Sequence, residues 1–541
     1  MLKTYLRFKT SLFLGGGIAL LLGGFAFALF YTLYLEQNGS LFEEIDKQVY
    51  GLLQFTLYQA FLSMILSLIV GLLVGWSLAH RATFFGRSFL VAIFSSSLVL
   101  PTLVVAFGII GIFGNNGWIN QLFVYCFDVS FGGYVYGLGG ILLAHTYLNA
   151  SFASRALLHS FQSVPTEKYK LAKSLGFSVF ERFWFVEYPV LKATLLSVGS
   201  TIFLLCFTSF AIVLLLGGGN PQYNTLEVAI YEAVKLDFDI GMALNLALIQ
   251  LTISAVFVVF SSGFKSRVSN LSTSNNRLKI KEIKGVVFFQ YTIIGLFAIF
   301  FILPLCVIVV EGVQADFSKI LHSEIFLKSF YTSITLATIS SFLTVIISLL
   351  LSATRRNFTL ESRLEKYPLS KFFNLFISFV GNLYLAIPSL VMGLGFFLIS
   401  QKYELPLIVW ATIALLVANV LVSLPFVLSV LNPLLQQTAQ RYDKLAFSLG
   451  ISGFKRWRYI EYPYIKSAIG YIFALSFCFS LGDLGIIALF GSDDFSTLPW
   501  YLYSLLGSYQ TNDASGVALI LLGIVLVVFV FVPKLFRSKD V

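Results

Sequence analysis

Long apolar stretches recur along the whole chain, and shorter polar segments that hold most of the charge separate them. A helix needs about 20 mostly apolar residues to cross a bilayer. The pattern therefore predicts an all-α polytopic membrane protein. Its twelve transmembrane helices are expected near residues 11–35, 52–79, 88–113, 134–158, 193–216, 241–260, 286–310, 326–353, 372–399, 405–431, 467–490 and 515–532.

The composition excludes a soluble protein of several domains. Of the 541 residues, 58% are hydrophobic and 11% are charged. The net charge of +10 is spread over many short segments, which argues against a nucleic-acid-binding face. The four cysteines are far apart and are interpreted as small core residues, since they form no disulfide or metal-site spacing.

Basic residues mark one side of the membrane. Of the 36 Lys and Arg residues, 31 lie in the termini and in every second inter-helix segment. Such segments face the cytoplasm in membrane proteins, so both termini are expected there. The first apolar stretch is too long for a signal peptide and is expected to stay as an anchor.

The two halves of the chain repeat each other. With Gly176 aligned on Gly450, an offset of 274 residues, 13 of 23 positions are identical between 170–192 and 444–466. Six spans in each half make the halves parallel, related by an axis along the membrane normal. We expect repeats at 1–262 and 286–541, joined by a polar cytoplasmic linker at 263–285.

The most similar segments are two loops, 163–190 (the first loop) and 437–464 (the second loop). In the first loop, Ser163 is expected to cap a short helix that Gly176 closes. Ser178 and Glu181 form a capping box for a second short helix, which Pro189 is expected to end. The second loop keeps Gly450, Ser452 and Pro463, so two short helices outside the bilayer are expected in both loops. Such a shape suits docking on a partner, and a contact with anionic lipid is the alternative.

These loops resemble the ATPase-docking loop of ATP-binding-cassette importer permeases. In each, an Ala is followed four residues later by Gly and then by Tyr-Pro. The resemblance assigns docking to Lys170, Leu171, Ala172, Gly176, Lys444, Leu445, Ala446 and Gly450. It implies a type I importer architecture, a cytoplasmic ATPase dimer and an extracytoplasmic substrate-binding protein. The family usually has Glu where Lys170 and Lys444 stand.

Two fused halves are similar to the iron(III) and thiamine branch of this family. The segments 481–491, 497–499 and 506–514, with 225–231 in the first half, resemble thiamine importer permeases. The resemblance implies transport of thiamine or its phosphates, and iron(III) or a polyamine remains an alternative. A secondary transporter driven by an ion gradient is the alternative from another class, and the matched loops argue against it.

No catalytic chemistry is expected in this chain. It contains no GxxxxGK[ST] phosphate-binding loop, so ATP hydrolysis is assigned to a separate partner. The four histidines, His80, His145, His159 and His322, form no metal-binding or catalytic spacing. No cofactor or metal is therefore expected.

Polar residues inside apolar stretches are candidates for a substrate pathway. Asp483 shares a helical stripe with Ser480 and could attract a cationic substrate, or it could cap a neighbouring helix. His145 and Asn149 match Asn419 and Ser423 through the 274-residue offset. These four could line a path or could form interhelical hydrogen bonds.

Overall fold

The computed structural model describes residues 12–36, 47–130, 133–217, 221–262, 283–360, 368–451 and 453–536. These residues form helices and turns, with no β-strand among them. Ten helices in the described ranges are long and apolar enough to cross a membrane. The prediction of an all-α polytopic membrane protein is confirmed.

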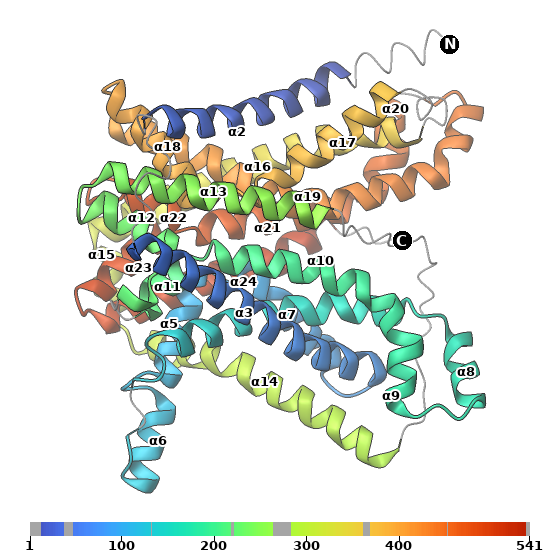
Figure 1. Cartoon of the computed structure of the whole chain (residues 1–541), viewed down its shortest axis with the longest axis horizontal. Helices are drawn as coiled ribbons and strands as arrows, with labels where there is room; N and C mark the ends of the chain where they lie inside the picture. The colour runs from blue at the N-terminus through green and yellow to red at the C-terminus, as the bar shows by residue number, and fades with distance from the viewer. Residues whose placement is uncertain are drawn as a thin grey trace. The chain divides into compact units, whose positions relative to one another are not determined.

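The α-helices follow one another along the chain as Figure 1 shows. Their bounds are α2 Gly17–Glu36, α3 Lys47–His80, α4 Arg87–Ser96, α5 Thr102–Phe113, α6 Trp118–Phe127, α7 Leu138–Gln162, α8 Thr166–Ser174, α9 Val179–Arg182, α10 Tyr188–Phe207, α11 Ala211–Leu216, α12 Leu226–Lys235, α13 Ile240–Ser262, α14 Lys284–Val313, α15 Phe317–His322, α16 Glu324–Leu360, α17 Pro368–Leu383, α18 Ser389–Lys402, α19 Leu407–Ser448, α20 Phe454–Arg456, α21 Tyr462–Gly482, α22 Gly485–Phe490, α23 Leu498–Gly507 and α24 Thr511–Leu535.

Several expected spans are interrupted. The stretch 88–113 is divided into α4 and α5 before Thr102, and 372–399 is divided into α17 and α18 before Ser389. In both cases a proline, Pro101 or Pro388, occupies the N-cap position of the second helix. Proline disfavours the helical conformation of the residue before it, so the preceding helix stops there. Each of these expected single spans is therefore two shorter helices.

The residues cluster into two compact units. The α3 unit comprises Ile45–Ala229 and Val259–Ala315. The α16 unit comprises Met1–Glu44, Ile230–Val258 and Asp316–Val541. The helix α14 thus belongs to the α3 unit, and α2 belongs to the α16 unit. The compact units differ in this respect from the two repeats seen in the sequence.

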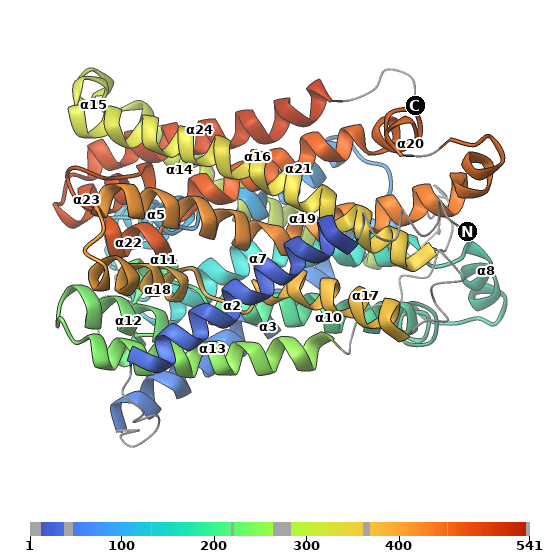
Figure 2. The ribbon, with the colours of Figure 1, turned by 90° about the horizontal axis from the view of Figure 1, so that it is seen from above.

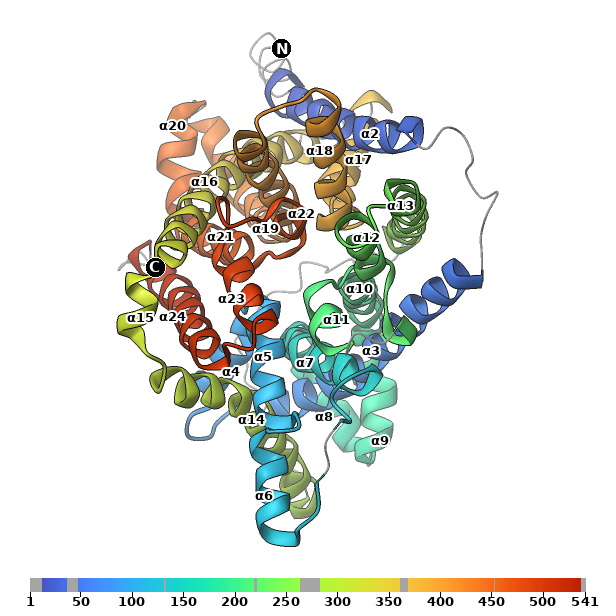
Figure 3. The same cartoon turned by 90° about the vertical axis from the view of Figure 1, so that its left-hand side faces the viewer.

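The α3 unit is built around α3, α7 and α10, which contact one another; Figure 3 shows α3 running obliquely across this view. Glycines allow α3 to approach α7 closely. A Cβ atom at Gly71 would lie 2.5 Å from Ala153 Cβ, and one at Gly75 would lie 2.8 Å from the Ser154 carbonyl oxygen. Both distances are shorter than van der Waals contact, so the Gly-x-x-x-Gly spacing serves helix packing.

The α16 unit is built in the same way from α16, α19 and α21, which run side by side in Figure 2. Val345, Val427, Leu431 and Ile472 form a buried apolar cluster between these helices. The helix α2 is fastened to the same unit, because the Tyr384 hydroxyl donates to the Leu22 carbonyl oxygen at 2.6 Å. The matched helices of the two repeats therefore form matched three-helix cores.

Candidate functional site: paired loops and polar helix contacts

The first loop folds around a left-handed glycine. The helix α8 ends at Ser174, and Gly176 follows with a φ of 73°, a conformation that suits glycine. The Glu181 N–H donates to Ser178 Oγ at 3.3 Å, and the Ser178 N–H donates to Glu181 Oε2 at 2.7 Å. The predicted left-handed turn and the predicted capping box are confirmed.

Two details of the predicted first loop are wrong. Ser163 does not cap α8: it follows the last residue of α7, and its hydroxyl donates to the Ser160 carbonyl oxygen at 2.8 Å. Pro189 does not end a helix, because it lies in the first turn of α10. Proline suits the first turn of an α-helix, because its fixed φ is helical. A π-helical turn over Phe183–Glu187 leads directly into α10.

The second loop repeats the turn but not the first short helix. Gly450 has a φ of 63°, as predicted, whereas α19 runs without interruption from Leu407 to Ser448. The prediction of two separate short helices is wrong here. One local difference is that Ala439 stands at the position of Pro165 and keeps its N–H, although α19 also continues through Pro425 and Pro433. Ser452 lies outside the described residues.

Both loops present the same apolar side chains to their surroundings. Leu171, Leu175 and Phe180 are 61%, 61% and 74% exposed, and their counterparts Leu445, Leu449 and Phe454 are 55%, 63% and 75% exposed. Lys170 and Lys444 are exposed beside them, while Ala172 and Ala446 are buried under them. Grouped exposed apolar side chains are typical of protein–protein docking surfaces.

A buried carboxylate lies at the base of the first loop. Glu187 is the last residue of the π-helical turn, and its side chain is fully buried. Glu187 Oε1 lies 3.1 Å from His80 Nε2 and 3.5 Å from Arg182 Nε. His80 is the last residue of α3, whereas Arg182 lies in the loop. The carboxylate therefore links the loop to the end of a long helix.

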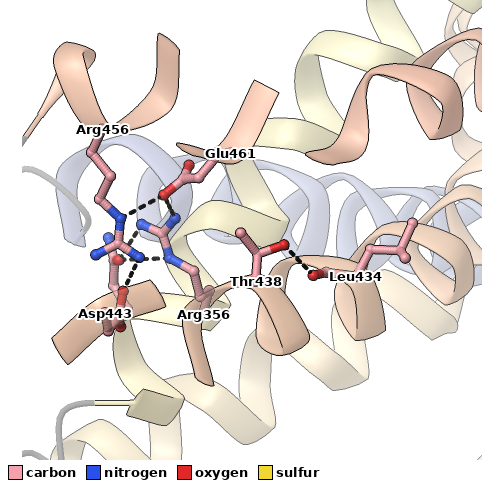
Figure 4. A network of polar contacts seen from close by, with 7 residues as sticks. Arg356, Leu434, Thr438, Asp443, Arg456 and Glu461 are labelled. Atoms are coloured by element: carbon pink, nitrogen blue, oxygen red, sulfur yellow. Dashed lines mark hydrogen bonds and ion pairs between the residues drawn. The ribbon is translucent and has the colours of Figure 1, made fainter. Parts of the chain in front are cut away.

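The second loop has the corresponding arrangement, which Figure 4 shows. Glu461 accepts hydrogen bonds from Arg456 Nε at 2.8 Å and from Arg356 Nη1. Arg356 belongs to α16, and Arg456 belongs to the loop. Arg456 also forms an ion pair with Asp443 of α19. Glu461 and Arg456 stand 274 residues after Glu187 and Arg182, so the two clusters match.

The pathway candidates of the α3 unit lie in a buried polar cluster. His145 Nδ1 is 3.0 Å from Ser63 Oγ, which joins α7 to α3. The Asn149 side-chain amide donates to Cys206 Sγ at 3.3 Å, which joins α7 to α10. Gln59 of α3 donates to the Cys206 carbonyl oxygen at 2.9 Å. Each contact connects two different helices of this unit.

The pathway candidates of the α16 unit are arranged in the same way. The Asn419 side-chain amide donates to Ser480 Oγ at 2.8 Å, and Ser340 Oγ donates to Ser480 Oγ at 3.0 Å. Ser423 donates to the Asn419 carbonyl oxygen at 2.8 Å. Ser480 stands 274 residues after Cys206. The structure therefore brings Asn419 and Ser480 together at the junction of α16, α19 and α21, whereas the Ser423 hydroxyl bonds within α19.

Asp483 lies at a break between two helices. The helix α21 ends at Gly482, Asp483 has extended backbone angles, and α22 begins at Gly485. The Ile486 N–H donates to Asp483 Oδ2 at 3.4 Å. The matched break in the first repeat lies between Phe207 and Ala211. The carboxylate thus contacts the first turn of α22, as the capping alternative expected.

Sequence reasoning did not select the buried carboxylates Glu187 and Glu461 or the exposed Phe180 and Phe454. A signal was present for the carboxylates: Glu is identical in both halves directly before Tyr-Pro, where an apolar helix begins. A charge repeated at the start of such a helix is costly unless it is paired. The exposure of the two phenylalanines depends on how the turn folds.

Comparison with known proteins decides the family. A family model described as "Binding-protein-dependent transport system inner membrane component" matches residues 367–537. The thiamine transport system permease protein ThiP of Brucella abortus (strain 2308) is 35% identical over 515 residues, which cover 94% of this chain and 92% of that protein. The protein of the same name from Escherichia coli (strain K12) is 34% identical over 491 residues, covering 91% and 90%.

This chain belongs to the thiamine transport system permease family. As a member of that family, it is a multi-pass inner-membrane transport subunit. A more distant relative is the Fe(3+)-transport system permease protein FbpB 2 of Haemophilus influenzae. That protein is 25% identical over 480 residues, which cover 85% of this chain and 84% of the relative.

Proposed function

We propose that this chain is the permease subunit of an ATP-driven importer and that it translocates thiamine or a thiamine phosphate. The observation that carries the substrate is the identity of about a third over more than nine-tenths of the chain to permeases named for thiamine transport. An extracytoplasmic binding protein would deliver the small cationic substrate. Iron(III) is the second candidate, because the Fe(3+) permease aligns with both halves.

The two loops are the proposed docking sites for a dimeric cytoplasmic ATPase. Each repeat has one such loop, so each loop would contact one subunit of the ATPase dimer. The exposed side chains Leu171 and Leu445, with Lys170 and Lys444 beside them, would contact that subunit. Gly176 and Gly450 shape the turn that presents them. Closure of the ATPase dimer on ATP would move both loops and, through them, the spans.

The orientation follows from the same proposal. The loops must face the ATPase, so 163–190 and 437–464 lie in the cytoplasm. The basic residues concentrate in these loops and in the segments on the same side, as expected for cytoplasmic segments. Both termini then also lie in the cytoplasm.

We further propose that Asp483, with Ser480, contributes to the substrate pathway of the second repeat. A carboxylate at a helix break could attract the positive thiazolium ring of thiamine. His145, Asn149, Asn419 and Ser423 remain pathway candidates. The hydrogen bonds of His145, Asn149 and Asn419 to other helices support the alternative that these three hold the helices together, whereas Ser423 bonds within α19.

Competition identifies the substrate. The permease, its ATPase and its binding protein are reconstituted in liposomes, and ATP-driven uptake of labelled thiamine is measured with excess unlabelled thiamine, thiamine pyrophosphate, iron(III) or spermidine. We expect only the two thiamine compounds to compete. No uptake of labelled thiamine, together with ATP-driven uptake of labelled iron(III) into the same liposomes, would support the second candidate.

A further inference from the structure

We propose that Glu187 and Glu461 are positioning residues, each of which fastens its loop to the end of a long helix in the same unit. A loop and the end of its long helix, α3 or α16, would then move together as one rigid body. This inference rests on the proposed docking of an ATPase at the loops and concerns how the docked ATPase moves the spans. We call the two clusters the first clamp (Glu187, Arg182, His80) and the second clamp (Glu461, Arg456, Arg356).

The two clamps share one geometry. In each, the carboxylate is the last residue of a π-helical turn, directly before the helix that enters the membrane. An arginine five residues earlier, Arg182 or Arg456, approaches the carboxylate from the loop. A second basic side chain, His80 or Arg356, approaches it from the C-terminal end of the long helix.

The basic residue on the long helix differs between the repeats: His80 is the last residue of α3, whereas Arg356 lies near the end of α16, two residues beyond Thr354, which matches His80. A basic side chain from the end of the long helix therefore contacts the carboxylate in both halves, as an imidazole in one and a guanidinium in the other. In the first clamp, His80 Nδ1 lies 2.9 Å from the Trp76 carbonyl oxygen. A carbonyl only accepts hydrogen bonds, so Nδ1 carries a proton, and Nε2 attracts the Glu187 carboxylate when His80 is an imidazolium with a proton on each ring nitrogen.

Burial makes the ion pairs of the two clamps difficult to separate. The side chains of Glu187 and His80 are fully buried, and those of Glu461 and Arg356 are 6% and 9% exposed. Separating a buried pair leaves charged groups without solvent, which is strongly unfavourable. The exposed pair Glu324–Lys328 on the same long helix α16 can open freely by comparison. The buried pairs are therefore the ones expected to keep a loop attached to its long helix when the docked ATPase moves the loop.

The second clamp is the more extensive. Arg456 also pairs with Asp443 of α19, so this clamp joins α16, α19 and the loop. The position that matches Asp443 in the first loop is Tyr169, which packs edge-on against the His80 ring at 6.3 Å. We therefore expect the loss of the carboxylate to disturb the second loop more than the first.

The test compares transport with ATP hydrolysis in the reconstituted importer. Glu461→Gln is expected to leave ATPase binding and hydrolysis in place and to lower the substrate transported per ATP by about fivefold or more, within the usual range of coupling between sites. Glu187→Gln should have a smaller effect in the same direction. Glu324→Gln, which opens the exposed pair of α16, is the matched control and should change neither quantity.

A conservative pair of variants separates positioning from folding. Arg356→Lys keeps a positive charge near Glu461 and should retain most of the substrate transported per ATP. Arg356→Gln removes this charge and should lower that ratio. If Glu461→Gln does not assemble, this pair decides the question. Equal transport per ATP in Arg356→Lys, Arg356→Gln and the unmodified protein would overturn the proposal.

A second readout needs no substrate. A cysteine at Lys328→Cys, at the opposite end of α16 from Arg356, is labelled with a maleimide after Cys126→Ser and Cys306→Ser remove the exposed native thiols. We expect ATP to change the labelling rate, and Glu461→Gln to abolish that change. An unaltered response in Glu461→Gln would overturn the clamp. If the unmodified chain does not bind the ATPase at all, the docking proposal fails instead.

Discussion

The side chain of Tyr147 contacts Phe301 twice, by stacking on its ring and by a hydrogen bond to its backbone. Their ring centroids lie 4.6 Å apart with planes 3° from parallel, and the Tyr147 hydroxyl donates to the Phe301 carbonyl oxygen at 2.8 Å. The contact fastens α14 to α7 within the α3 unit. Tyr147 is fully buried, and both contacts join α7 to α14.

Removing the Tyr147 hydroxyl should therefore destabilise the protein. Tyr147→Phe keeps the stacked ring but removes the buried hydrogen bond between α7 and α14, which contributes about 0.5–1.5 kcal/mol. Thermal unfolding of the purified protein in detergent should show a lower midpoint. Tyr125→Phe, at a tyrosine that is 89% exposed, is the control and should have no effect. Equal midpoints for both variants would contradict this role of Tyr147.

Substitution of the turn glycines should uncouple ATP hydrolysis from transport. Gly176 and Gly450 have positive φ values and no atoms within 4 Å of an added Cβ, so the cost of Val comes from the backbone, about 1–3 kcal/mol. Asn tolerates this conformation better than Val. We expect Gly450→Val to lose transport per ATP and Gly450→Asn to keep more of it.

The control for the glycine variants is Gly523→Ala, in open space within α24. It should retain full transport per ATP. Normal coupling in both Gly176→Val and Gly450→Val would mean that the shape of the loops does not matter for docking.

The exposed leucines of the loops should carry ATPase binding. Leu171→Asp and Leu445→Asp place a charge in the proposed contact, and the loss of an apolar anchor at an interface weakens binding by about tenfold or more. Co-purification with the ATPase measures this loss. Leu236→Asp, at a leucine that is 65% exposed outside the loops, should leave binding unchanged. If it weakens binding equally, the leucines are not specific anchors.

Two variants of Asp483 distinguish its charge from its hydrogen bond. Asn can still accept from the Ile486 N–H but carries no charge, whereas Ala does neither. If the carboxylate attracts a cationic substrate, Asp483→Asn should lower uptake nearly as much as Asp483→Ala, with normal assembly of both. Uptake that falls only in Asp483→Ala would assign Asp483 to the capping of α22.

The sequence predicted the features that depend on regular patterns. The all-α polytopic class followed from the apolar stretches, and the left-handed turns followed from Gly176 and Gly450, since few other residues suit that conformation. It could not predict where a helix continues. Pro165 precedes the separate helix α8, whereas α19 continues through the matched Ala439 and through two prolines, and Pro101 and Pro388 stand where two expected spans are divided.

The buried clamps lay beyond sequence reasoning because their members are distant in the chain. Arg356 and Glu461 are separated by 105 residues, and His80 and Glu187 are joined only by the packing of α3 against the loop that precedes α10. A pattern within one helix cannot reveal such pairs. The exposed Lys170 and Lys444, where the wider importer family usually has Glu, were visible in the sequence.

The central claim is that this chain is the permease of an ATP-driven thiamine importer. The most direct measurement is the initial rate of labelled thiamine uptake into proteoliposomes that hold the chain, its ATPase and its binding protein, with and without ATP on the ATPase side. The account predicts uptake that requires ATP and persists when ion gradients are dissipated. Uptake that follows an ion gradient without ATP would contradict it.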